Sequence, residues 1–116
     1  RSRGRGDVYK RQVDCGIGVN SDRIRSQFEG GAQFATSLAM TSAITFENGQ
    51  VQQNNFDTYQ IIRMPQAPKK IEVHLVPSME KPTGVGEPPV PPFIPALANA
   101  MYKLTGKRNY ELPFKV

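Results

Sequence analysis

The sequence predicts an α+β fold, with a small mixed or antiparallel sheet and two main helices packed on it. Residues 21–41 and 94–104 carry apolar side chains at helical spacing, and these stretches supply the two helices. The dipeptide Asn48-Gly49, between two strand-like runs, predicts a hairpin. Residues 71–76 alternate between apolar and polar side chains, which is typical of a half-buried strand. A chain of 116 residues suits one domain.

The first helix is expected to begin at Asn20-Ser21-Asp22, because these side chains favour helix N-termini. The pair Gly30-Gly31 interrupts it, and each glycine costs about 1 kcal/mol relative to alanine. Two explanations stay open: close approach of a ligand or another backbone, or tight packing of the helix itself. The apolar face of this helix consists of Ile24, Phe28, Ala32, Ala35 and Ala39.

Two further stretches are expected to be extended. Residues 13–20 should form a short strand that runs into a turn, and residues 61–64 should be extended before prolines break the chain. Within residues 71–76 the apolar side chains fall on one face, and Glu72 and His74 fall on the other.

The isolated Cys15 and His74 do not indicate a metal or redox centre. One cysteine can form neither an internal disulfide nor a zinc or iron–sulfur site, so Cys15 is expected to be a small buried side chain. No other ligand-type residues accompany His74 on its strand face. Structural roles are therefore expected for both.

Residues 82–92, Pro-Thr-Gly-Val-Gly-Glu-Pro-Pro-Val-Pro-Pro, form a loop before the second helix. Gly84 and Gly86 allow unusual backbone angles or close approach to a ligand, and the prolines that follow stiffen the chain. Glu87 stands between them as the single carboxylate. A rigidly held acid suits general acid–base chemistry, but glycine and proline also mark ordinary surface turns. The residues alone leave both interpretations open.

The second helix follows this loop directly. Pro95 is tolerated in a first helical turn, and Gly106 is expected to end the helix. Its apolar stripe consists of Ile94, Leu97, Ala98, Met101 and Leu104.

The charge distribution argues against a nucleic-acid-binding face. The net charge is +5, but most of it belongs to residues 1–12, which are rich in arginine. No apolar run approaches the roughly 20 residues of a membrane-spanning helix. Neither nucleic acid nor a membrane is therefore an expected partner.

Six blocks of sequence together resemble the C-terminal end of the molybdopterin-binding large subunit of molybdenum hydroxylases, the xanthine dehydrogenase and aldehyde oxidoreductase family. The isoquinoline 1-oxidoreductase large (beta) subunits are the most similar branch. The resemblance covers essentially residues 13–113. Its blocks are residues 13–16, 27–31, 55–59, 76–78, 84–88 and 96–100.

The resemblance implies roles for the unusual residues. Glu87 corresponds to the general base of an enzyme that hydroxylates an N-heteroaromatic compound or an aldehyde with water-derived oxygen; it stands beside the molybdenum without being a firm ligand. Gln27 corresponds to a glutamine that contacts the pterin. Family members often carry Gln-Gly where this chain has Phe34-Ala35, so no second contact is expected there. The remaining cofactor-binding residues implied by the resemblance are Gly30, Gly31, Val85 and Gly86.

The chain is expected to consist of a short tail and part of one domain. Residues 1–12 are expected to be a disordered, non-native tail, because residues 7–12 are similar to a translated sequencing-adapter remnant. Residues 13–116 then form the C-terminal part of a larger molybdopterin-binding domain. The expected partners are the N-terminal remainder of the large subunit, a small [2Fe-2S] subunit, a small aromatic or aldehyde substrate and, as one candidate electron acceptor, a cytochrome c. The isolated segment should be inactive, and its compartment stays open between periplasm and cytoplasm.

An alternative function is a small non-catalytic interaction module. Residues 88–92 contain the Pro-x-x-Pro spacing, which favours polyproline II and docking on aromatic grooves. These prolines lead straight into an apolar helix, so they are expected to be packed rather than presented.

Overall fold

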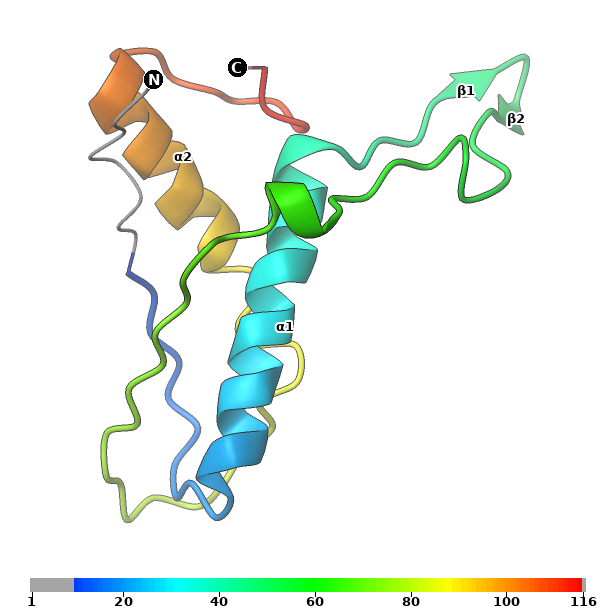
Figure 1. Ribbon diagram of the computed structural model, residues 1–116. Helices are drawn as coiled ribbons and strands as arrows, with labels where there is room; N and C mark the ends of the chain where they lie inside the picture. Colours follow the sequence, from blue (N-terminus) through cyan, green and yellow to red (C-terminus); the bar gives the residue numbers. More distant parts are fainter. Residues whose placement is uncertain (1–9, 116) are drawn as a thin grey trace.

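The computed structural model describes residues 10–115, in which two helices cross and a hairpin stands apart from them (Figure 1). Most of the expected tail, residues 1–9, lies outside this range. The expected α+β class is confirmed. The elements in chain order are α1 (Ser21–Met40), β1 (Phe46–Glu47), β2 (Gln50–Val51), a 3₁₀ turn (Met64–Gln66) and α2 (Phe93–Thr105).

Local signals define α1 as the sequence predicts. Asn20 caps the helix, because its Oδ1 accepts a hydrogen bond of 3.0 Å from the backbone N–H of Arg23. At the other end the N–H of Thr41 donates to the carbonyl of Ser37 over 3.0 Å. The predicted bounds are therefore correct to within one residue.

The core lies where α1 meets the start of α2. Ala32 and Ala35 of α1 are at most 1 % exposed and contact Phe93, which is itself only 1 % exposed. Small side chains on α1 allow the aromatic ring to approach the helix backbone closely. The partly buried side chains around this contact are Ile71, Val90, Ile94 and Leu97.

The second helix and its end also follow the prediction. Pro95 lies in the first turn of α2, and Gly106 ends the helix with a left-handed φ of 71°. Beyond it the chain returns to α1, where the N–H of Phe114 donates to the carbonyl of Ala39 over 2.7 Å. Phe114 is 7 % exposed and closes that end of the core.

The hairpin is confirmed, with β1 and β2 antiparallel and Phe46 opposite Val51. Asn48 and Gly49 both have positive φ, 50° and 78°, as a primed two-residue turn requires. The hairpin lies in an arm, residues 43–59, that leads away from the helices (Figure 1). The hairpin contacts neither helix.

Two expected strands are not formed among the residues that the structure describes. Residues 13–20 contain no strand, although the N–H of Ile17 donates to the carbonyl of Glu80 (3.0 Å) and that of Thr83 to the carbonyl of Cys15 (2.9 Å). Residues 71–76 contain none either. A strand exists only when a neighbouring strand completes its hydrogen bonds. The expected sheet is thus reduced to the hairpin, and the helices pack on each other instead of on a sheet.

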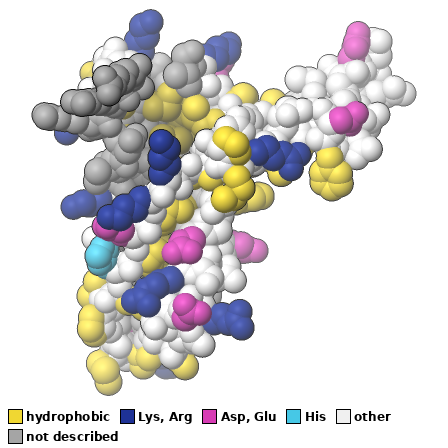
Figure 2. Space-filling view, in the orientation of Figure 1, with side chains coloured by type: hydrophobic (Ala, Val, Ile, Leu, Met, Phe, Trp, Pro, Cys, Tyr) yellow, Lys and Arg dark blue, Asp and Glu magenta, His cyan; other side chains and the backbone are white. Residues whose placement is uncertain are grey.

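The chain buries little of its apolar surface on itself. Its accessible surface is 9478 Å², whereas a compact monomer of this mass exposes about 6,300 Å². Its radius of gyration is 16.4 Å, against about 13.4 Å for a compact domain of this length. Figure 2 shows apolar side chains reaching the surface over both the helical part and the arm. No helix within residues 10–115 is long and apolar enough to cross a membrane.

Candidate functional site

The loop 82–92 is anchored on α1 at Gly31. A Cβ atom placed on Gly31 would lie 3.0 Å from Cβ of Pro89 and 3.7 Å from Cγ2 of Val90. Pro89 is fully buried by this contact. Tight packing therefore explains Gly31, because side chains of the chain's own proline-rich loop occupy the space that a Cβ would need.

Gly30 differs from its neighbour. A Cβ atom on Gly30 would meet nothing within 4 Å among the described residues, and the glycine is exposed. Its helix-destabilising cost is thus not offset by packing within this segment. The surface of α1 at this glycine is therefore open within the described residues.

Gln27 and Gly86 come together at the same place. The Oε1 atom of Gln27 lies 3.8 Å from the position that a Cβ on Gly86 would take, which is an ordinary van der Waals distance. Gln27 is one helical turn before Gly31 and exposed, and Val85 is half-buried. A side-chain amide from α1 and the glycine-rich backbone of the loop therefore share one surface.

Two successive turns fix the backbone around Glu87. Its carbonyl accepts a 2.9 Å hydrogen bond from the N–H of Val90, and the carbonyl of Val90 accepts one of 3.1 Å from the N–H of Phe93. Pro89 lies inside the first turn and is held against α1. The side chain of Glu87 is exposed and makes no ion pair with any residue in the described range. The acid therefore combines a fixed backbone with an unengaged carboxylate.

A second contact fixes the start of the loop. Gly16 has a φ of 66° and is buried, and a Cβ there would overlap the carbonyl oxygen of Lys81. The N–H of Gly16 donates to Oδ1 of Asp14 over 3.1 Å. The contact of Gly16 with Lys81 and that of Pro89 with Gly31 were not predicted from the sequence. The glycine in each contact was the only sequence signal for it.

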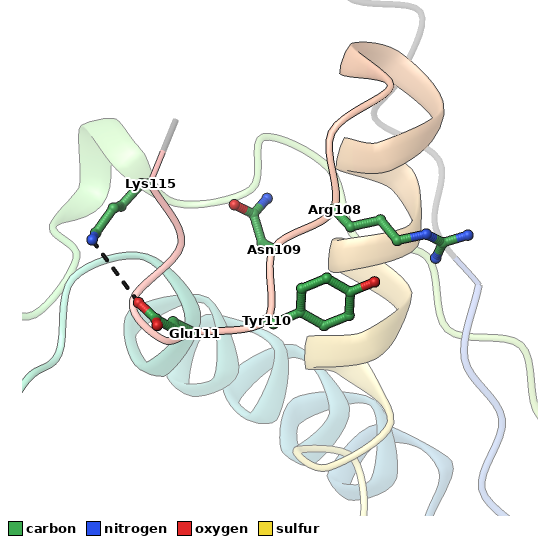
Figure 3. A pocket seen from close by; sticks show the side chains of 5 residues that line it. All are labelled: Arg108, Asn109, Tyr110, Glu111 and Lys115. Carbon is green, nitrogen blue, oxygen red and sulfur yellow. Dashed lines mark ion pairs between the residues drawn. The ribbon is translucent and has the colours of Figure 1, made fainter.

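The hollow drawn in Figure 3 lies elsewhere, beyond α2, and contains none of the candidate residues. It is lined by polar and charged side chains on the C-terminal segment. Nζ of Lys115 and Oε2 of Glu111 are 4.0 Å apart, and both side chains are almost fully exposed. Exposed pairs of this kind contribute little to stability. Within residues 10–115 no three or more His, Cys, Asp or Glu side chains gather as a metal site would require.

Three known proteins that are similar to this chain have the names of oxidoreductases or dehydrogenases. It is 32 % identical over 103 residues to the membrane-bound aldehyde dehydrogenase (pyrroloquinoline-quinone) of Gluconacetobacter polyoxogenes. It is 33 % identical over 103 residues to the beta subunit of isoquinoline 1-oxidoreductase from Brevundimonas diminuta. It is 35 % identical over 101 residues to a subunit of nicotinate dehydrogenase from Pseudomonas putida.

These matches cover most of this chain but little of each relative. They include 89 %, 89 % and 86 % of the chain, but only 13 %, 13 % and 8 % of the respective relatives. A continuous match of 103 residues in a chain of 116 has to take in α1, the loop 82–92 and all but the last two residues of α2.

The model of one family, described as the molybdopterin cofactor-binding domain, matches residues 7–68. The match begins inside the range 1–12, which was expected to be a tail, and it includes all of α1 and the hairpin. It covers more than half of the chain, and its description names the cofactor that the resemblance implies. The chain belongs to the molybdopterin cofactor-binding domain family.

Proposed function

We propose that residues 13–116 are the C-terminal part of the molybdopterin-binding subunit of a molybdenum hydroxylase. This oxidoreductase would hydroxylate an N-heteroaromatic compound or an aldehyde with water-derived oxygen. Family membership supports the cofactor, and relatives named for an aldehyde, isoquinoline and nicotinate support the substrate classes. The observation that carries the proposal is the position of Glu87: its backbone is fixed by the turn that Val90 closes, and it directly follows Gly86, which lies beside Gln27.

The residues of this surface fit one wall of a pterin cofactor. The amide of Gln27 offers both a donor and an acceptor, and Gly86 permits close approach of a ligand to the backbone. The open surface at Gly30, one helical turn after Gln27, leaves room for a ligand. We assign direct cofactor contact to Gln27, Gly30, Val85 and Gly86. Gly31 is covered by Pro89, so its proposed role is to seat the loop.

In the proposed reaction a substrate carbon loses hydrogen and gains oxygen from water, with release of two electrons and two protons. The cofactor, when bound, supplies a Lewis acid and accepts the two electrons. Glu87 accepts the proton that the attacking water gives up. The turn closed by Val90 keeps the backbone of this acid in place. Pre-positioning of this kind lowers the barrier because the base does not have to be ordered during reaction.

The two electrons must then pass to an acceptor. A single cysteine cannot hold an iron–sulfur cluster. We therefore propose that a small [2Fe-2S] subunit accepts them, with a cytochrome c as a candidate final acceptor. Two of the relatives are themselves named as subunits. The remainder of the large subunit would complete the cofactor and substrate sites.

The test uses the longer enzyme with Glu87→Gln, and Glu80→Gln as the matched control. Glu80 is also exposed and lies just before the loop. Loss of a general base lowers kcat by about 10²- to 10⁴-fold, so Glu87→Gln should do so with an unchanged molybdenum content. Glu80→Gln should retain full turnover. Near-normal turnover of Glu87→Gln would remove Glu87 from the mechanism.

Elemental analysis for molybdenum, together with an assay for quinone, identifies the cofactor in the same preparation. One relative is named for pyrroloquinoline quinone, so the purified enzyme should be assayed for both groups. Stoichiometric molybdenum without quinone is the expected result. Quinone without molybdenum would contradict the proposed chemistry.

The alternative of a proline-rich interaction module is less well supported. Residues 88–92 form successive turns rather than an extended polyproline II helix, and Pro89 is buried against α1. A docking peptide has to present its prolines to a groove. This segment uses them to position the loop.

A further inference from the structure

We propose that residues 71–76 are an edge strand that pairs with a strand from another part of the longer polypeptide, outside residues 10–115. The inference rests on the proposed function only in that such a longer polypeptide exists. It does not depend on the role of Glu87 or on the identity of the cofactor.

The pattern of burial is that of a strand with one covered face. Ile71, Val73 and Leu75 are half-buried, whereas Glu72, His74 and Val76 are exposed. Ile71 packs against the core between the helices. Such strict alternation arises when an extended chain lies on a core with its other face in solvent.

The backbone of this segment is not paired with any residue in the described range. No backbone hydrogen bond joins residues 71–76 to any residue from 10 to 115. The segment is rich in β-branched residues, which favour strands. Pro68 and Pro77, which lack N–H donors, lie on either side and limit any ladder to this stretch. An extended segment with free N–H and C=O groups is a ready template for another strand.

The outer face is polar enough to remain in solvent after pairing. Glu72 forms an ion pair with Lys70, and its Oε2 lies 3.8 Å from Nε2 of His74. Figure 2 shows this histidine at the surface, next to a basic and an acidic side chain. A new strand would therefore add at an edge of the segment and leave this face exposed.

The size of the relatives identifies the partner as the rest of the polypeptide. The chain corresponds to only 13 % of two relatives and 8 % of a third. Its accessible surface exceeds that of a compact monomer by roughly half. A segment that exposes so much surface is expected to pack against the remaining polypeptide. Ile71 already packs on the core and Val73 and Leu75 are half-buried, so pairing requires little further ordering of this strand.

Hydrogen–deuterium exchange tests the pairing without any measurement of activity. Peptides covering residues 69–77 are compared between the isolated chain and the longer polypeptide encoded at its native locus. Exchange at residues 71–76 should slow by about a hundredfold or more in the longer polypeptide, as for amides in a stable ladder. Equal rates in the two proteins, or a locus that encodes no further polypeptide, would overturn the proposal.

Proline substitutions provide the second test, because alternate residues direct their N–H groups to opposite edges of a strand. His74→Pro and Leu75→Pro therefore remove one donor from each edge, with His74→Ala and Leu75→Ala as controls for the side chains. In the longer polypeptide one proline should lower the melting temperature well below that of its alanine control. In the isolated chain both proline–alanine differences should be small, since neither amide is bonded.

Two outcomes would contradict the inference directly. If neither proline differs from its alanine control in the longer polypeptide, the segment is not paired there. If the isolated chain forms a dimer by light scattering and its residues 71–76 are protected only in that dimer, the partner strand comes from a second copy.

Discussion

The two adjacent glycines of α1 give a sharp test of how the loop is positioned. Gly30→Ala and Gly31→Ala make the same chemical change one residue apart in the same helix. Each replaces a poor helix former with the best one, which alone stabilises a helix by about 1 kcal/mol. Any difference between the two variants must therefore come from what surrounds each new methyl group.

The surroundings differ strongly. The methyl at residue 30 meets nothing within 4 Å in the part of the chain that the structure describes, so Gly30→Ala should stabilise the fold by about 0.5–1 kcal/mol. The methyl at residue 31 would lie 3.0 Å from Cβ of the buried Pro89, closer than carbon atoms normally pack. Overpacking of this kind costs about 1–3 kcal/mol, which cancels or exceeds the helical gain.

The expected difference in unfolding free energy between the variants is therefore about 1–3 kcal/mol. Thermal unfolding followed by circular dichroism should place Gly31→Ala at least about 4 °C below Gly30→Ala. Equal stabilisation by both substitutions would refute the close contact between α1 and the loop.

In the longer enzyme, the Gly30→Ala variant also tests whether this glycine contributes to cofactor binding. If Gly30 borders the cofactor, Gly30→Ala should lower the molybdenum content even though it stabilises the fold. Full molybdenum content in a stabilised Gly30→Ala enzyme would remove Gly30 from the cofactor wall.

Two further predictions concern Gly16 and Glu72. Gly16→Ala should destabilise the fold by more than about 1 kcal/mol in urea unfolding, because the residue has positive φ and no space beside the carbonyl of Lys81; an unchanged midpoint would contradict this. The hydrogen bond and charge of Lys70 lower the pKa of Glu72, so Lys70→Met should raise that pKa toward its ordinary value in an NMR titration. Lys70 lowers this pKa because it stabilises the charged form of Glu72 in the folded protein. The small contribution of the pair to folding stability is therefore present above the ordinary carboxyl pKa, and it disappears as the pH falls through the lowered pKa. An unshifted titration in the variant would show that the pair does not form in solution.

Helices and the hairpin could be predicted because their causes lie close together in the sequence. The cap at Asn20, the positive φ at Asn48 and Gly49, and the left-handed Gly106 each act within a few residues. Patterns of this range are visible without any knowledge of the rest of the fold.

Residues 71–76 illustrate the opposite case. Their alternation correctly indicates which side chains are half-buried, yet no strand is formed there within residues 10–115, because a strand also needs a partner that its own residues cannot specify. The contact between Gly31 and Pro89 was missed for the same reason. The sequence shows a helix-destabilising glycine at residue 31 and a proline-rich loop at residues 82–92, but it does not show that the loop packs on this glycine.

Glu87 is positioned by contacts that lie entirely within this segment. Pro89 rests on Gly31, Val90 closes the turn, and Phe93 ties the loop to the helical core. None of these contacts involves the hairpin. Residues 71–76 reach the same core through Ile71, but their backbone makes no hydrogen bond within residues 10–115. The turn and the contact between Pro89 and Gly31 therefore fix the backbone of the acid from within this segment, while the proposed strand 71–76 would join the segment to the longer polypeptide.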